Sequence, residues 1–424
     1  MNIKTLKNLI THPLISGSTI IFIGSMLANV FAYLFNLSMG RLLTVQDYGL
    51  LTSLVSIVSL FAIFQGSLSG IFTRFAARFK ANDNTKAFSS LLLNGMKFTF
   101  IIAAVIFIFF AVSLIFLPSF LKVQNPLLLI IVFATIFFSI FSSIAFGVLQ
   151  GEMKFYLLSF LNALGPFLKI ALGVLAILVG LKIFGVIVGI FLSVFIPTLI
   201  AFAFVLKKHP FQRNNGVDET DFVKEFKNYS FYFFLATLGI TIISNTDIIL
   251  VRHFFNETIS GQYAALSLMG KAIFYVTSPI YFVFFPLITH KREKNESVLN
   301  TLLLAASIVV LCSVGLSFVY FLFPHFVLSI FFPAQAYAIL APYLGPYSLY
   351  ILLFSLAYLF NNYFLSIGET KIYKFNLFAG AFFVLFIVLF HQSLYQVIGI
   401  LFVISFLLLV SYLLYYYHLT HGND

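Results

Sequence analysis

Residues 126–149 read PLLLIIVFATIFFSIFSSIAFGVL, and this stretch contains no charged side chain. An α-helix rises about 1.5 Å per residue, so about 20 apolar residues cross the roughly 30 Å hydrocarbon core of a bilayer. The stretch is therefore long enough and apolar enough to span a membrane. Because lipid offers no hydrogen bonds to the backbone, we expect the segment to satisfy its own peptide groups as a helix.

The composition of the whole chain agrees with this stretch. Of the 424 residues, 61% are hydrophobic and 9% are charged, whereas soluble domains usually carry about 25% charged residues. A soluble fold of this length has too little interior to hide so much apolar surface, so lipid is the solvent for much of it. We predict an all-α, polytopic integral membrane protein.

Twelve windows of the sequence, including the one quoted, are long and apolar enough to cross a bilayer. They are residues 14–39, 48–72, 91–117, 126–149, 156–180, 183–206, 229–252, 263–288, 299–323, 339–366, 374–392 and 394–417. The first window is too long for the core of a signal peptide, so we interpret it as a retained helix.

The basic residues indicate how these spans are oriented. With the N-terminus in the cytoplasm, most lysines and arginines between the spans lie on the cytoplasmic side, as the positive-inside rule requires. We therefore expect a protein of the cell (cytoplasmic) membrane with both termini in the cytoplasm. The net charge of +11 then reflects orientation and contact with lipid head groups, and does not indicate a nucleic-acid partner.

The longest polar stretch, residues 207–227, divides the chain near its midpoint. We predict an N-terminal six-helix lobe over residues 1–210, a cytoplasmic linker with a short amphipathic helix over 211–228, and a C-terminal six-helix lobe over 229–424. Residues 41–54, RLLTVQDYGLLTSL, are echoed by 252–266, RHFFNETISGQYAAL. Such parallel repeats predict a pseudo-twofold axis along the membrane normal.

Several short motifs carry a resemblance to a known family. They are Asp47–Gly49 after the first span, residues 147–151 (GVLQG) after the fourth, Asp247 in the seventh, residues 261–263 (GQY) after it, and residues 286–289 (PLIT) at the end of the eighth. Together with the twelve-span layout, they resemble the polysaccharide flippases of the multidrug/oligosaccharidyl-lipid/polysaccharide exporter superfamily, also called MOP or MATE-like.

This resemblance implies two six-helix lobes in a V-shaped molecule around a central cavity. It also implies a cargo, a polyprenyl-pyrophosphate-linked oligosaccharide that alternating access moves from the inner to the outer leaflet for cell-surface polysaccharide biosynthesis. Membrane lipids, a polysaccharide polymerase and glycosyltransferases are the partners implied. A multidrug antiporter of the same superfamily is the alternative function.

Lys169 is the most informative ionisable residue, because it lies near the middle of the fifth span. A lysine at the centre of a membrane helix costs about 2.5–3.5 kcal/mol on insertion scales, which makes it a functional candidate by default. The preceding Gly165 and Pro166 interrupt the helix one turn earlier. Lys169 either lines a cavity and attracts a pyrophosphate or acidic sugar, or pairs with a carboxylate or with carbonyl groups between helices.

Two further spans carry ionisable groups. Asp247, in the seventh span, is a candidate for proton or sodium coupling, and its structural alternative is a salt bridge near the outer interface. Lys271, in the eighth span, either lines the cavity or extends its ammonium group toward the interface.

The remaining candidates are polar residues in the first two spans. Arg74 and Arg78 lie four residues apart on one helical face at the cytoplasmic end of the second span, where they can meet a pyrophosphate or simply follow the positive-inside rule. Asn29, Asn36 and Gln65 either bind sugar hydroxyls or form hydrogen bonds between helices.

The sequence also lacks several motifs. It has no Walker-type phosphate loop and no Cys/His cluster, so we expect no bound cofactor, no metal and no direct use of ATP. The longest external segment, residues 324–338, carries no charged residue, which argues against an enzyme such as a polymerase. Within the spans cations outnumber acids, which favours an anionic cargo over the cationic drugs of an antiporter.

Overall fold

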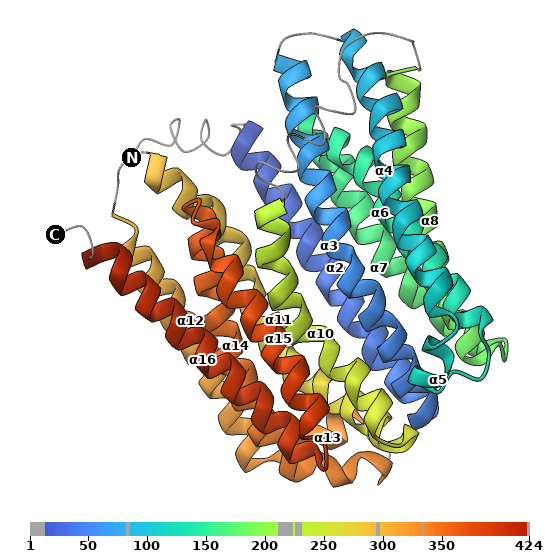
Figure 1. Cartoon of the computed structure of the whole chain (residues 1–424), viewed down its shortest axis with the longest axis vertical. Helices are drawn as coiled ribbons and strands as arrows, with labels where there is room; N and C mark the ends of the chain where they lie inside the picture. Colours follow the sequence, from blue (N-terminus) through green and yellow to red (C-terminus); the bar gives the residue numbers. More distant parts are fainter. Residues whose placement is uncertain are drawn as a thin grey trace. The chain divides into compact units, whose positions relative to one another are not determined.

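The computed structural model describes residues 13–81, 85–210, 224, 231–293, 297–332 and 335–421, and all of its regular structure is helical. The long helices, drawn in Figure 1, are α2 (Pro13–Leu42), α3 (Val45–Ala81), α4 (Thr85–Ser113), α6 (Leu127–Gly151), α7 (Phe155–Leu178), α8 (Lys182–Lys208), α10 (Phe231–Phe254), α11 (Glu257–Glu293), α12 (Leu299–Leu322), α14 (Ala341–Ser366), α15 (Tyr373–Leu389) and α16 (Leu394–His421). Short helices α5 (Leu117–Leu121) and α13 (Pro324–Phe331) and the 3₁₀ helices η2 (Gln335–Leu340) and η3 (Thr370–Ile372) lie between them.

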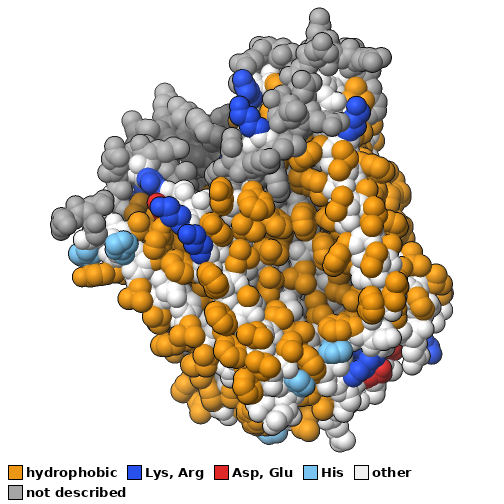
Figure 2. All heavy atoms as spheres, viewed as in Figure 1, with side chains coloured by type: hydrophobic (Ala, Val, Ile, Leu, Met, Phe, Trp, Pro, Cys, Tyr) orange, Lys and Arg blue, Asp and Glu red, His pale blue; other side chains and the backbone are white. Residues whose placement is uncertain are grey.

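Among the described residues, twelve helices are long and apolar enough to cross a membrane, and each matches one of the predicted windows. The all-α, multi-pass fold class is therefore confirmed. Figure 2 shows hydrophobic side chains over the visible flanks of the helices, with the visible lysines and arginines near the helix ends. This distribution fits a chain whose flanks face lipid.

The helices form two compact units. The first comprises Met1–Met39 and Phe61–Phe231, and the second comprises Gly40–Leu60 and Tyr232–Asp424. The beginning of α3 therefore packs with the C-terminal helices. Of the predicted linker, residues 211–228, only Lys224 lies among the described residues. The division into lobes at residues 210 and 229 stays a prediction.

Two pairs of helices show that the repeat extends well beyond the echoed motif. Helices α3 and α11 are each 37 residues long and begin 212 residues apart, at Val45 and Glu257. Helices α8 and α16 begin at Lys182 and Leu394, which are separated by the same interval. This constant offset identifies equivalent positions in the two halves of the chain.

Equivalent residues of α3 and α11 contact one another within the second unit. Gln46 Nε2 donates a hydrogen bond to Thr258 Oγ1 at 3.2 Å. A Cβ on Gly49 would lie 2.7 Å from the amide nitrogen of Gly261, and one on Gly261 would overlap the carbonyl oxygen of Val45. Small residues thus let the two helix backbones approach closely, as in other membrane helix pairs.

The ends of α6 and α8 are joined by an ionic cluster around the buried carboxylate of Glu152 in the first unit. Glu152 Oε1 lies 2.6 Å from Lys208 Nζ and 2.7 Å from His209 Nε2. The His209 ring stacks on Phe88, with the ring centroids 4.2 Å apart. Burial raises the pKa of Glu152, but the hydrogen bonds and charges of His209 and Lys208 outweigh it, so this pKa lies below its ordinary value.

Candidate functional site

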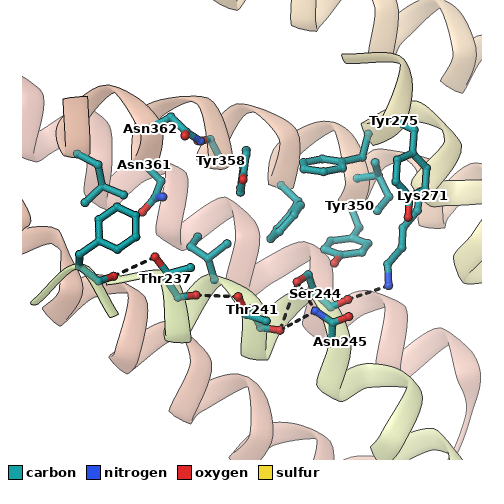
Figure 3. A pocket seen from close by; sticks show the side chains of 16 residues that line it. Thr237, Thr241, Ser244, Asn245, Lys271, Tyr275, Tyr350, Tyr358, Asn361 and Asn362 are labelled. Carbon is teal, nitrogen blue, oxygen red and sulfur yellow. Dashed lines mark hydrogen bonds between the residues drawn. The ribbon is translucent and has the colours of Figure 1, made fainter. Parts of the chain in front are cut away.

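The second unit contains a cavity of about 360 Å³ between α10, α11 and α14. Figure 3 shows its lining side chains. Its polar lining residues, tyrosines included, are Thr237, Thr241, Ser244, Asn245, Lys271, Tyr275, Tyr350, Tyr358, Asn361 and Asn362. Ligand cavities in proteins range from about 300 to 1,000 Å³, so this cavity is large enough for a small ligand.

One wall of the cavity is a polar stripe on α10. Thr237, Thr241 and Asn245 are four residues apart, so they project from the same helical face. Thr237 Oγ1 and Thr241 Oγ1 each donate to the carbonyl oxygen four residues earlier, at 2.9 Å. These bonds let a spanning helix carry hydroxyl groups without leaving their protons unsatisfied, while their oxygens remain acceptors.

Lys271 contributes the cation of this cavity. Its Nζ donates to the carbonyl oxygen of Ser244 at 2.7 Å, as drawn in Figure 3. Lys271 and Asp247 are also close enough to interact electrostatically. The two side chains form no direct ion pair among the described residues. A role for Lys271 in binding the cargo stays a prediction.

Asp247 is fully buried behind the cavity. Its Oδ2 accepts hydrogen bonds from Tyr263 Oη at 2.9 Å and Tyr347 Oη at 3.4 Å. Its Oδ1 has no hydrogen-bond partner among the described residues. A buried carboxylate oxygen without a donor is a place where a proton or a small cation lowers the free energy. The proposed role of Asp247 in ion coupling remains a prediction.

Lys169 lies in the first unit, on α7. Its Nζ is 4.4 Å from the centre of the Phe35 ring on α2, in a cation–π arrangement. Within the described parts of the chain, no carboxylate or hydrogen-bond acceptor pairs with this ammonium group. Of the two interpretations of Lys169, the structure thus offers no support for pairing.

Two of the amides in the first two spans, Asn36 and Gln65, have hydrogen-bond partners within the first unit. Asn36 Nδ2 donates to the Ala32 carbonyl oxygen at 2.9 Å, within α2. Gln65 joins α3 to α6, because its Nε2 donates to Ser142 Oγ at 3.0 Å and its Oε1 accepts from Ser139 Oγ at 3.2 Å. These hydrogen bonds agree with the interhelical interpretation of Gln65, and its role in binding sugar hydroxyls stays a prediction.

The remaining predicted residues are more exposed. Asn29 is half-buried on α2, and Arg74 and Arg78 are exposed near the end of α3. Lys271 and Asp247 are the candidates brought together in the second unit. In the first unit, Asn36 directly follows the Phe35 ring that contacts Lys169.

Sequence reasoning missed the tyrosines around Asp247 and the aromatic wall of the cavity. Tyr347, Tyr350, Phe354 and Tyr358 recur every three or four residues along α14, and all but Tyr347 line the cavity. This spacing is visible in the sequence. Ordinary helix packing produces the same spacing, so the pattern alone does not reveal a cavity.

Comparison with solved structures identifies proteins of the same fold. A multidrug resistance MATE family transporter of the MOP superfamily, in its inward-facing conformation, aligns with a TM-score of 0.69 and 16% identity over 93% of this chain and 96% of that one. The lipid II flippase MurJ, in an inward closed conformation, aligns with a TM-score of 0.70 and 16% identity over 93% of this chain and 86% of that one. The chain therefore shares its fold with these two proteins, in agreement with the resemblance seen in the sequence motifs.

The family follows from the sequence itself. The model of the family described as "Polysaccharide biosynthesis protein" matches residues 14–292, which is more than half of the chain. The chain therefore belongs to this family of multi-pass membrane proteins. No curated protein sequence is a significant match to the chain.

Proposed function

We propose that this protein is a flippase that moves a polyprenyl-pyrophosphate-linked oligosaccharide from the cytoplasmic to the outer leaflet by alternating access, for cell-surface polysaccharide biosynthesis. The family supports a role in polysaccharide biosynthesis. The resemblance in fold to a lipid II flippase supports a lipid-linked cargo. The observation that supports an anionic cargo is the ammonium group of Lys169, which has no carboxylate partner among the described residues.

The ammonium group of Lys169 raises the free energy of the empty protein. An uncompensated cation at membrane depth costs several kcal/mol, and nothing in the first unit's described residues offsets this cost with a negative charge. A diphosphate supplies two or more negative charges and strong acceptor oxygens. Binding the cargo's pyrophosphate therefore stabilises the loaded state relative to the empty one.

The surroundings of the proposed flippase follow from the same function. We place it in the cytoplasmic membrane with both termini in the cytoplasm, among glycosyltransferases that complete the cargo and a polymerase that consumes it outside. We propose that it catalyses no covalent step itself. Asp247 is the candidate for coupling transport to a proton or sodium gradient, since its Oδ1 lacks a donor in the described chain.

A multidrug antiporter is the second candidate function. The buried carboxylate of Asp247 and the similarity in fold to MATE transporters favour it. Against it, Lys271 lies near that carboxylate and repels a cationic drug.

Reconstitution into liposomes tests the two functions together. One assay follows a labelled polyprenyl-pyrophosphate oligosaccharide between leaflets, and the other follows efflux of a cationic dye. We expect the lipid to move and the dye to stay. Movement of the dye without the lipid would reject the flippase in favour of the antiporter.

A further inference from the structure

We infer that the cavity between α10, α11 and α14 binds an uncharged sugar residue of the cargo's glycan. This inference rests on the proposed flippase function and adds a subsite to it. The pyrophosphate is assigned to the first unit through Lys169, whereas the cavity lies wholly within the second.

The cavity has one polar wall and one aromatic wall. The polar stripe of α10 lies along one side in Figure 3, and the rings of Phe274, Phe354 and Tyr358 line the cavity from α11 and α14. The Phe274 ring lies 5.8 Å from Phe354 and 5.1 Å from Tyr358, centre to centre. A pyranose ring has an apolar face and a rim of hydroxyl groups, which matches these two surfaces.

The polar groups also retain unused hydrogen-bonding capacity. Asn245 Nδ2 donates to the Thr241 carbonyl oxygen and to Ser244 Oγ, at 3.1 and 2.9 Å, and Asn362 Nδ2 donates to the Tyr358 carbonyl oxygen at 2.8 Å. Within the described residues, neither amide oxygen accepts a hydrogen bond. Lys271 uses one of its three N–H groups on Ser244. The half-buried wall thus offers both acceptors and donors to sugar hydroxyls.

The charge of the cavity selects against ionic ligands. Lys271 lines the cavity and the fully buried Asp247 lies on the neighbouring part of α10, so a bound group meets charges of both signs in this unit. An acidic sugar or a phosphate would gain attraction from Lys271 but would also be repelled by Asp247. A cationic amphiphile would be repelled by the ammonium group of Lys271, which lines the cavity. An uncharged sugar avoids both penalties and uses the hydroxyl and amide groups.

Transport of two lipids by the same liposomes tests this inference. The first is the lipid-linked oligosaccharide isolated from the protein's own host, and the second is bare polyprenyl pyrophosphate. The variants are Asn245→Leu and Thr241→Val on the polar wall and Tyr358→Ala on the aromatic wall. Ser411→Ala is the control, because Ser411 lies on α16, outside the cavity lining, and its hydroxyl makes the same kind of bond to the preceding turn.

We expect each cavity variant to raise the KM for the glycan-bearing lipid about fivefold to tenfold, since each removes a contact of about 1 kcal/mol. Transport of bare polyprenyl pyrophosphate should not change, which also shows that the variants are folded. Equal effects on both lipids, or no effect on either, would overturn the inference while leaving the flippase intact. If the wild-type protein moves neither lipid, the proposed function fails, and the inference fails with it.

Discussion

The two units place their lysines beside equivalent positions but give them different partners. Phe35 in the first unit and Asp247 in the second are 212 residues apart, the offset that relates the two halves. The Phe35 ring lies under the ammonium group of Lys169, and Asp247 interacts with Lys271. One position of the repeat therefore decides whether a carboxylate acts on its unit's cation.

This difference gives Lys169 and Lys271 different electrostatic surroundings. An aromatic ring attracts a cation without cancelling its charge, so Lys169 remains available to an anion. A nearby carboxylate opposes the charge of Lys271, which agrees with the uncharged ligand that we propose for the second unit.

The largest effect on stability is expected from removing the buried carboxylate of the second unit. Asp247→Asn removes the negative charge that acts on Lys271 and weakens the hydrogen bonds from Tyr263 and Tyr347, which should cost about 2–3 kcal/mol in the free energy of unfolding. Adding Lys271→Met removes the remaining charge and should recover part of that loss. Thermal unfolding in detergent measures both variants. A double variant as unstable as the single one would show that the two side chains are not coupled.

The largest effect on transport is expected in the first unit. Lys169→Gln removes the ammonium group that we assign to the pyrophosphate, and transport should fall by roughly tenfold to a hundredfold, as 1.4–2.7 kcal/mol of lost attraction implies. Lys182→Gln is the control, since Lys182 lies at the start of α8, away from mid-span. Normal transport by the well-folded Lys169→Gln variant would remove this residue from the site.

The crossing of α3 and α11 gives an intermediate effect. Gly261→Ala places a methyl group against the carbonyl oxygen of Val45, and forcing the helices apart should cost about 1–3 kcal/mol. Gly315→Ala is the matched control, because a Cβ on Gly315 of α12 meets no atom within 4 Å. If the two variants have the same unfolding temperature, the close approach contributes nothing to stability.

A smaller effect is expected from pH at the ionic cluster of the first unit. Because the pKa of Glu152 is lower in the folded protein than its ordinary value of 4.5, the carboxylate contributes stability above that pH. The contribution, about 1 kcal/mol, is lost as the pH falls through the lowered folded value. Glu152→Gln should remove this component from a profile of unfolding temperature against pH between about 6 and 3. An unchanged profile would contradict the assignment.

The smallest effect is expected at Gln65. Gln65→Leu removes the hydrogen bonds between α3 and α6, which are worth about 0.6 kcal/mol in membrane proteins on average. Transport should remain within about twofold of the wild type. A large loss of transport with unchanged stability would instead place Gln65 in contact with the cargo.

The sequence predicted the fold far better than the surroundings of the candidate residues. Apolar runs such as residues 126–149 predict a helix by themselves, because a segment that spans lipid must satisfy its backbone hydrogen bonds locally. The 212-residue offset was visible from the echoed motifs around Gly49 and Gly261. The positions of Lys169 and Lys271 in their spans were equally readable. The side chains near these lysines could not be predicted, because nothing in the sequence indicates that Phe35 lies beside Lys169 or that Asp247 acts on Lys271.

The lining of the cavity was even harder to predict from the sequence. Asn361 and Asn362 stand out as amides in an apolar run, and the sequence marks them as polar but not as neighbours of Thr237 and Thr241. That proximity depends on how α14 packs against α10 and α11. Helix packing in membranes is governed by contacts that a single span does not encode.

We propose that Lys169, which has no carboxylate partner among the described residues of the first unit, recognises the negative charge of the cargo. The most direct measurement compares transport of one oligosaccharide on polyprenyl pyrophosphate with transport of the same oligosaccharide on an uncharged polyprenyl lipid. The wild-type protein should move the charged lipid about tenfold faster or more, and Lys169→Gln should abolish this preference. Equal rates for the two lipids in the wild type, or an intact preference in Lys169→Gln, would contradict the account.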